Sequence, residues 1–149
     1  MLDPLPRIMG LDVGDRRVGV AVSDELGITA QPVLTLVRSN RRQDLKSIQR
    51  LIRRYHCSAI VVGNPLYMSG DQSPQAAKAQ TFAQMLRDET GLPVHLWDER
   101  LTTTEAHRHL HAAGRAGSEH KAVVDQVAAV LILEGYLSAR KAVRQSPVS

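Results

Sequence analysis

Three acidic positions in this sequence stand apart from ordinary surface carboxylates because of the residues around them. Asp12 lies near the end of an alternating apolar stretch, in GLDVGDRRVGVAVSD. Asp98 and Glu99 together end the run VHLWDE. Asp125 is followed by alanine at the third and fourth positions and by isoleucine at the seventh, which places it on a small, apolar stripe of a helix.

These carboxylates predict a particular chemistry. An ionised carboxylate among apolar residues needs a partner or a metal ion. Oxygen ligands favour Mg²⁺ and Mn²⁺, and such ions hold phosphates. Two of them roughly 3.5–4 Å apart stabilise the attacking and leaving oxygens when a phosphodiester bond is cleaved. The acidic set therefore indicates metal-assisted chemistry on phosphodiesters.

Each position also has a simpler interpretation. The Asp12 carboxylate is equally suited to an Asx-type turn, in which it accepts from backbone N–H groups near Gly14. Asp125 is suited to a salt bridge with Lys121, one helical turn earlier. Strand alternation places Asp98 and Glu99 on opposite faces, so only one of them readily joins Asp12, and the alternation does not say which.

The elements that position these residues follow from periodicity and from start and stop signals. Residues 8–13 and 18–23 alternate as two strands of a hairpin, and 28–37, 59–67 and 93–100 predict three further strands. A helix is expected through the basic segment 38–54. A second begins at the N-cap Ser73 and stops at Gly91, and a capping box over 102–105 opens a short third. A long helix is predicted from about residue 119 to 139.

The resulting order is three strands, helix, strand, helix, strand and two helices. It predicts a mixed five-stranded α/β sheet with helices on both faces. The chain has 149 residues, 43% hydrophobic and 23% charged, which suits one globular domain over 1–149 with a frayed tail over about 140–149. A single cysteine, Cys57, is expected in a buried strand and suits a reducing cytoplasm. The longest apolar run near the C-terminus, VAAVLIL, is too short to span a bilayer, so a soluble protein without a membrane partner is expected.

The net charge of +4 is concentrated in one segment. Residues 38–54 hold seven basic residues and one acid, a net +6, which leaves −2 for the remainder. Arg42, Lys46 and Arg50 follow one outer row of the predicted helix. They are suited equally to a solvated face and to a surface that contacts a phosphate backbone.

Four segments carry a resemblance to a known family. GLDVGDRRVGVAVSD, VVGNPLYMSG, DERLTTTEA and VDQVAAVLILEGYL occur in an order and spacing that resemble the YqgF/RuvX family, over about residues 7–138. That family has an RNase H-like fold. The resemblance implies an RNase H-like domain with metal-dependent nuclease activity, linked in bacteria to processing the 5′ end of precursor 16S ribosomal RNA and also proposed to resolve Holliday junctions.

The same resemblance implies roles for individual residues. The acidic positions of the family fall on Asp12, Glu99 and Asp125, as catalytic residues and as ligands of Mg²⁺ or Mn²⁺ in a two-metal site. The segment GNPLYMSG departs from the usual GLPLNMDG, and it introduces Tyr67. We expect Tyr67 either to stack on an unpaired base, worth roughly 1–3 kcal/mol, or to cap the core. Lys121 is expected near the scissile phosphate.

Three other interpretations stay open from the sequence. Actin-like ATPases also begin with an Asp-x-Gly hairpin, but this chain holds one copy rather than two. A non-catalytic nucleic-acid-binding module needs the basic helix without the carboxylates. His107 and His111, in HRHLH, have the spacing of two zinc ligands, with no third ligand placed by spacing. The sequence leaves RNA or branched DNA open as the substrate, and a monomer or homodimer as the assembly.

Overall fold

The computed structural model describes residues 6–101 and 118–145, and it contains a five-stranded mixed sheet. The strands lie in the order β3-β2-β1-β4-β5. β1 pairs antiparallel with β2 and β2 with β3, whereas β1–β4 and β4–β5 are parallel pairs. The strands are β1 (Arg7–Val13), β2 (Arg17–Ser23), β3 (Ala30–Val37), β4 (Cys57–Asn64) and β5 (Val94–Asp98).

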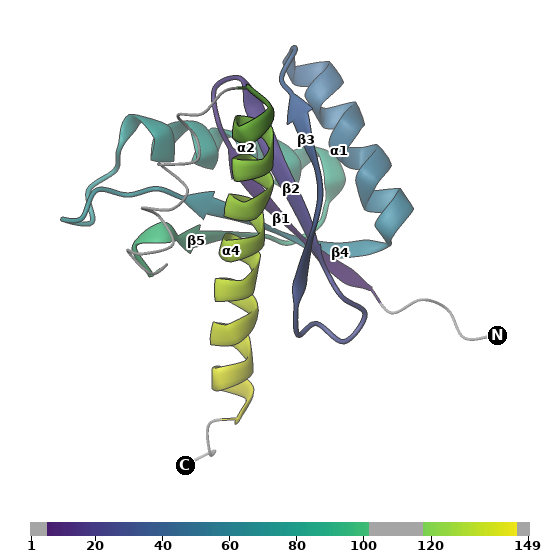
Figure 1. Ribbon diagram of the computed structural model, residues 1–149, viewed down its shortest axis with the longest axis vertical. Helices are drawn as coiled ribbons and strands as arrows, with labels where there is room; N and C mark the ends of the chain where they lie inside the picture. Colours follow the sequence, from purple (N-terminus) through teal and green to yellow (C-terminus); the bar gives the residue numbers. More distant parts are fainter. Residues whose placement is uncertain (1–5, 102–117, 146–149) are drawn as a thin grey trace.

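Helices cover both faces of this sheet, as Figure 1 shows. α1 (Arg41–Tyr55) and α2 (Pro74–Thr90) pack on one face, and α4 (Ser118–Gln145) crosses the other. The mixed five-stranded α/β sheet predicted from the sequence is confirmed. The predicted short helix from 102, and the two histidines of HRHLH, fall outside the described residues.

The hairpin divides its side chains between the two faces as the alternation predicts. Met9, Leu11 and the valines at 18, 20 and 22 are buried in the core beneath α1 and α2. Ile8 and Ala21 point the other way and pack against α4. The period of two in the sequence therefore assigns every residue of this hairpin to the correct side.

Local signals set the ends of α2. The Ser73 hydroxyl accepts from the backbone N–H of Ala76 at 3.0 Å, and Pro74 fills the first helical position. Gly91 ends the helix with φ +70°, a left-handed conformation that glycine adopts without steric cost. Both predicted ends of this helix are confirmed.

Helix α4 continues to Gln145, beyond the predicted end at about residue 139, so the predicted tail over 140–149 is too long. The window Lys121–Lys141 is long and apolar enough to cross a membrane by length and composition alone. One such helix is weak support for a membrane span, because a core helix passes the same test. Here Ala129, Ile132 and Leu133 are buried against the sheet.

The parallel arrangement of β1, β4 and β5 brings their carboxyl ends to one edge of the sheet. β1 ends at Val13, β4 at Asn64 and β5 at Asp98. In open sheets with parallel strands, ligands bind outside this edge. Asp12 and the Asp98–Glu99 pair both lie there.

Candidate active site

Asp12 lies near the end of the central strand and points to the face that α4 covers. Its Cα partner in β2 is Gly19, and directly paired residues of antiparallel strands project to the same face. Ile8, four residues earlier on β1, packs in the α4 cluster. The β1–β2 turn is closed by the N–H of Gly14, which donates to the Arg17 carbonyl oxygen at 2.9 Å. The Gly14 N–H is therefore committed to the backbone of the turn.

Asp125 reaches the same place from α4. A Cβ at Gly19 would lie 1.9 Å from the carbonyl oxygen of Asp125 and 3.1 Å from its Cβ. Position 19 therefore accepts no side chain, and its hydrogen lets α4 approach the strand closely. The result is that Asp125 lies over the residue that pairs with Asp12.

The Asp125 carboxylate pairs with Arg17 in this structure. The simpler interpretation of the sequence had named Lys121 as its partner. Arg17 Nε donates to Asp125 Oδ2 at 2.6 Å, and the two side chains are 31% and 20% exposed. Arg17 is 108 residues away in the chain, so helix spacing did not reveal it. Lys121 is exposed on α4, one turn before Asp125.

We predict that Asp125→Asn lowers cleavage strongly and stability only slightly. The variant loses a partly exposed ion pair, worth about 1 kcal/mol or less, and its side chain keeps almost the same volume. Thermal melts with and without Mn²⁺ should show a small change in metal-free stability and a weaker stabilisation by metal than in the wild type.

Arg17→Gln is the matched control for this substitution, because it removes the same ion pair and keeps the carboxylate. It should show a similar stability change and retain cleavage. A loss of about 3–5 kcal/mol in Asp125→Asn with normal cleavage would instead assign Asp125 a structural role.

Glu99 follows β5 and does not belong to it. The strand ends at Asp98, and Glu99 begins the short 3₁₀ helix η1 (Glu99–Leu101). A Cβ at Gly63 would lie 3.2 Å from the carboxyl carbon of Glu99 and 2.5 Å from Ile132 Cδ1 of α4. The Glu99 carboxyl group is thus on the α4 face, beside the end of β4.

The predicted strand over 93–100 was too long, and this explains why alternation did not separate Asp98 from Glu99. The chain changes from strand to 3₁₀ helix between them, so a period of two no longer applies. Burial, followed by the negative charge of Asp98, raises the pKa of the Glu99 carboxyl to about 7. Of this acidic pair, Glu99 is therefore the one that takes up a proton first as the pH falls through about 7.

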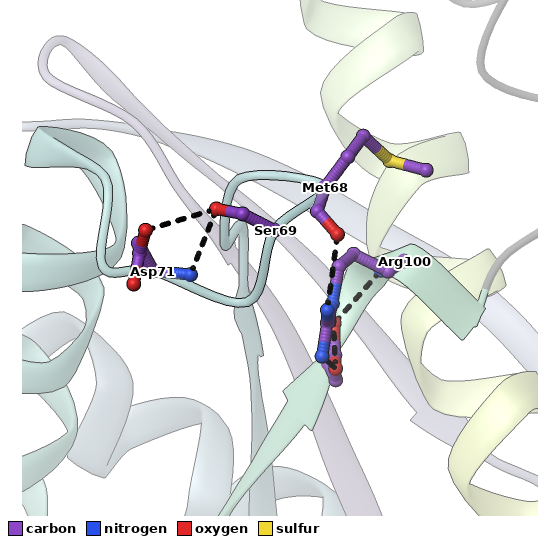
Figure 2. A network of polar contacts seen from close by, with 5 residues as sticks. Met68, Ser69, Asp71 and Arg100 are labelled. Carbon is purple, nitrogen blue, oxygen red and sulfur yellow. Dashed lines mark hydrogen bonds and ion pairs between the residues drawn. The ribbon is translucent and has the colours of Figure 1, made fainter.

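Asp98 has a different role in this structure, as an anchor for Arg100. The Arg100 side chain donates to both Asp98 oxygens, with Nη2 2.6 Å from Oδ2 and Nε 3.0 Å from each. This pairing lowers the pKa of Asp98. Arg100 Nη1 also donates to the Met68 carbonyl oxygen at 3.3 Å. Figure 2 shows that Arg100 joins the end of β5 to the loop after β4.

The loop after β4 presents two large side chains to solvent. Tyr67 is 54% exposed and Met68 is 84% exposed. The Tyr67 N–H donates to the Asp71 carbonyl oxygen at 3.0 Å, and the Gly70 N–H donates to the Tyr67 carbonyl oxygen at 2.8 Å. The Ser69 hydroxyl adds a 3.1 Å bond to Asp71, also drawn in Figure 2. Tyr67 thus does not cap the core.

The basic residues singled out from the sequence are divided between the two faces. Arg42, Lys46 and Arg50 are exposed on α1, on the face opposite α4. Lys121 shares α4 with Asp125. Lys121 is therefore on the same helix as one of the three acids. The row of basic residues on α1 lies on the other side of the sheet from the face to which the carboxylates point.

The donor chemistry of Asp12, Glu99 and Asp125 suits Mg²⁺ or Mn²⁺, since all three offer only carboxylate oxygens. Within 6–101 and 118–145, no three His, Cys, Asp or Glu side chains are gathered closely enough to form a ready metal site. The Arg17 ion pair holds Asp125, and a metal ion would have to compete with it.

The sheet order, the antiparallel hairpin followed by parallel strands, and the acidic edge define an RNase H-like α/β domain. RuvC of Thermus thermophilus, solved in complex with a Holliday junction substrate, has this fold as well. It matches with a TM-score of 0.56 at 14% identity, over 91% of this chain and 96% of that one.

The family is more specific than the fold. A family model described as "RuvX: Holliday junction resolvase" matches residues 6–139, and the chain belongs to the RuvX family. A protein of Koribacter versatilis (strain Ellin345), named "Putative pre-16S rRNA nuclease", is 46% identical over 143 residues, which cover 96% of this chain and 94% of that protein. A protein of the same name from Moorella thermoacetica is 50% identical over 131 residues, 88% and 94% of the two chains.

Proposed function

We propose that this protein is a divalent-metal-dependent nuclease that acts on the 5′ region of precursor 16S ribosomal RNA. The observation that carries the proposal is the approach of α4 to the sheet at Gly19, which brings Asp125 over the strand partner of Asp12. Glu99 reaches the same face beside Gly63. The names of the similar proteins from Koribacter and Moorella supply the substrate.

In this proposal Asp12, Glu99 and Asp125 are the catalytic residues and would hold Mg²⁺ or Mn²⁺, as a two-metal site. Bound metal would supply an activated water and neutralise charge on the scissile phosphate. Arg17 neutralises the Asp125 carboxylate without metal. Below about pH 7 a proton on Glu99 would have to leave before its oxygens could coordinate. Lys121, exposed one turn before Asp125, is assigned to the phosphate near the cleavage point.

Substrate binding is assigned to residues outside the carboxylate set. Arg42, Lys46 and Arg50 contact the phosphate backbone, since all three are exposed along one row of α1. Tyr67 stacks on an unpaired base, because its ring is more than half exposed on a loop with defined hydrogen bonds.

We predict that reversing Arg42, Lys46 and Arg50 to Glu weakens substrate binding and flattens its salt dependence. Each lost phosphate contact reduces the slope of log affinity against log salt by about 0.7 for a single strand. The metal requirement should not change. The matched control is Lys141→Glu, an exposed reversal at the far end of α4. An unchanged slope in the triple variant would show that α1 is only a solvated face.

A cleavage panel tests the proposed reaction. Single-stranded RNA with the precursor 5′ sequence, single-stranded DNA of the same sequence and a four-way DNA junction are each incubated with Mn²⁺, Mg²⁺ or EDTA. Metal-dependent cleavage of the RNA alone supports the proposal. Paired cuts in the junction favour the second candidate, a Holliday junction resolvase, which the description of the matching family model supports. Binding without any cleavage would indicate a non-catalytic module.

Assembly and location follow from the same proposal. An RNA-trimming enzyme can work as a monomer, whereas paired cuts in a junction need a two-fold homodimer, so a monomer in light scattering of the purified protein would count against the resolvase. We propose a cytoplasmic location. Its support is a single thiol, that of Cys57, which is buried in β4, as expected from the sequence.

A further inference from the structure

A groove opens on the face of the sheet opposite α4. It lies between the β1–β2 turn, the start of α1 and one side of α2, and its volume is about 650 Å³. This volume is within the usual range for small-molecule sites. Three basic side chains, Arg38, Arg41 and Lys78, and three apolar ones, Ala77, Phe82 and Met85, are among its lining.

Arg38 is held rigidly in this groove. Its Nη1 donates to the Gly14 carbonyl oxygen at 3.0 Å, and its Nε lies 3.4 Å from Asp44 Oδ2. The guanidinium carbon is 5.2 Å from the centroid of the Phe82 ring. These contacts use two of the five guanidinium N–H groups and fix the plane of the others. A guanidinium held in this way loses little entropy when it binds a phosphate or stacks on a base.

The other two cations are exposed at the sides of the groove. The Arg41 side chain is 69% exposed, and Lys78 is 53% exposed. The two acids of the lining are already engaged: Asp44 accepts from the Ser39 N–H at 3.0 Å, and Asp15 accepts from Lys78 Nζ at 2.7 Å. Each cation already has a carboxylate beside it: Arg38 pairs with Asp44, Lys78 with Asp15, and Arg41 lies 3.9 Å from Glu89. Three basic groups against two acids in the lining leave one net positive charge, and an anion that enters must compete with these pairs.

The position of the groove connects it to the carboxylates. Gly14, whose carbonyl oxygen holds Arg38, is two residues beyond Asp12. Asp12 faces α4, and the groove lies on the other face at the same end of β1. A nucleic-acid strand that crosses this edge of the sheet passes from the carboxylates to the groove around the β1–β2 turn.

We propose that this groove binds one nucleotide unit of the substrate strand, away from the scissile phosphate. Arg38, Arg41 and Lys78 take the phosphate, and the base lies against the apolar floor at Phe82 and Met85. The assignment to a strand rests on the proposed nuclease function, whereas nucleotide binding by the groove does not.

Binding of a fluorescein-labelled hexauridylate in EDTA tests the groove without cleavage. Arg41→Gln with Lys78→Gln should weaken binding about tenfold and reduce the salt slope by about 1.4, as expected for two lost phosphate contacts. Arg53→Gln with Arg54→Gln is the matched control, because it removes the same charge from exposed residues in the last turn of α1. Its affinity should stay within about twofold of the wild type.

A second pair of variants tests the groove by volume rather than charge. Thr81→Trp places a large side chain on the groove lining and should weaken hexauridylate binding, whereas Gln84→Trp, on exposed α2 surface outside the lining, should not. The proposal is overturned if each groove variant and its control change hexauridylate affinity to the same extent. Adenosine 5′-monophosphate serves as a competitor: binding as tight as that of the hexamer would overturn the assignment to a strand and indicate a site for free nucleotides.

The same measurements separate this proposal from the nuclease proposal. If the wild type cleaves no substrate yet the groove variants lose hexauridylate affinity, the nuclease proposal fails and the nucleotide site stands. If cleavage is normal and both groove pairs match their controls, only the groove assignment fails.

Discussion

Asp12→Asn should lose cleavage by roughly 10³-fold or more, equivalent to about 4 kcal/mol of transition-state stabilisation, while substrate binding persists. Asp12 is on the central strand, and the other two proposed ligands, Glu99 and Asp125, lie on the same face of the sheet. The substitution removes a charge with almost no change in volume, so the packing of β1 against α4 is retained. Single-turnover cleavage in Mn²⁺, binding in EDTA and a thermal melt measure the three consequences separately.

Asp88→Asn provides the matched control for this variant. Asp88 is exposed on α2, where its carboxylate accepts from Gln84, and the same isosteric change there should leave cleavage within about twofold. Full activity in Asp12→Asn would remove the carboxylate set from the mechanism. Loss of folding in Asp12→Asn would instead make Asp12 a structural residue of the hairpin.

Glu99→Gln should reduce cleavage by roughly 10²–10³-fold, and Asp98→Asn by less than about tenfold. Glu99 turns its carboxyl group toward α4 beside Gly63, whereas Asp98 is engaged by Arg100. The effect of Asp98→Asn should be indirect, through a looser connection between Arg100 and the loop at Met68. The opposite ranking of the two variants would show that Asp98 is the functional acid of this pair.

The raised pKa of Glu99 gives this pair of variants a second readout. In the unfolded chain its pKa is 4.5, and in the folded protein it is about 7. Between these values the folded state retains a proton that the unfolded state has lost, so metal-free stability falls as pH rises from about 4.5 to 7 and then levels off. Glu99→Gln should remove up to about 3 kcal/mol of this pH dependence, measured by urea unfolding in EDTA at several pH values.

Features decided by near neighbours in the chain could be predicted from the sequence. The alternation of Val18, Val20 and Val22 reflects direct burial, so it identified the hairpin and the side to which each residue points. Ser73, Pro74 and Gly91 act on their own helix and gave its ends correctly. The three acidic positions were proposed from carboxylates in apolar surroundings and from the resemblance to a family, and their role as ligands stays a prediction.

Features that depend on distant segments could not be predicted. Arg17 and Asp125 are on different elements, so only the packing of α4 on β2 makes them partners. Arg100 bonds to Asp98 at the end of β5 and also to Met68, which is in a loop after another strand. The groove is formed by the β1–β2 turn, α1 and α2 together, so no single segment of the sequence reveals it. In the sequence, Arg38 is one of seven basic residues in the segment 38–54 and has no distinguishing mark.

The proposed site takes one of its three acids from α4, and this has a consequence for protein synthesis. This helix is the last of the described elements, and it supplies Asp125 to a hairpin completed about a hundred residues earlier. A nascent chain on the ribosome therefore carries Asp12 and Glu99 before it can acquire the third acid, and until then the face with Ile8, Ala21 and Val61 has no cover. Under the proposed function the chain becomes competent only after α4 has been synthesised, and we expect products that lack α4 to be inactive and to expose this apolar surface.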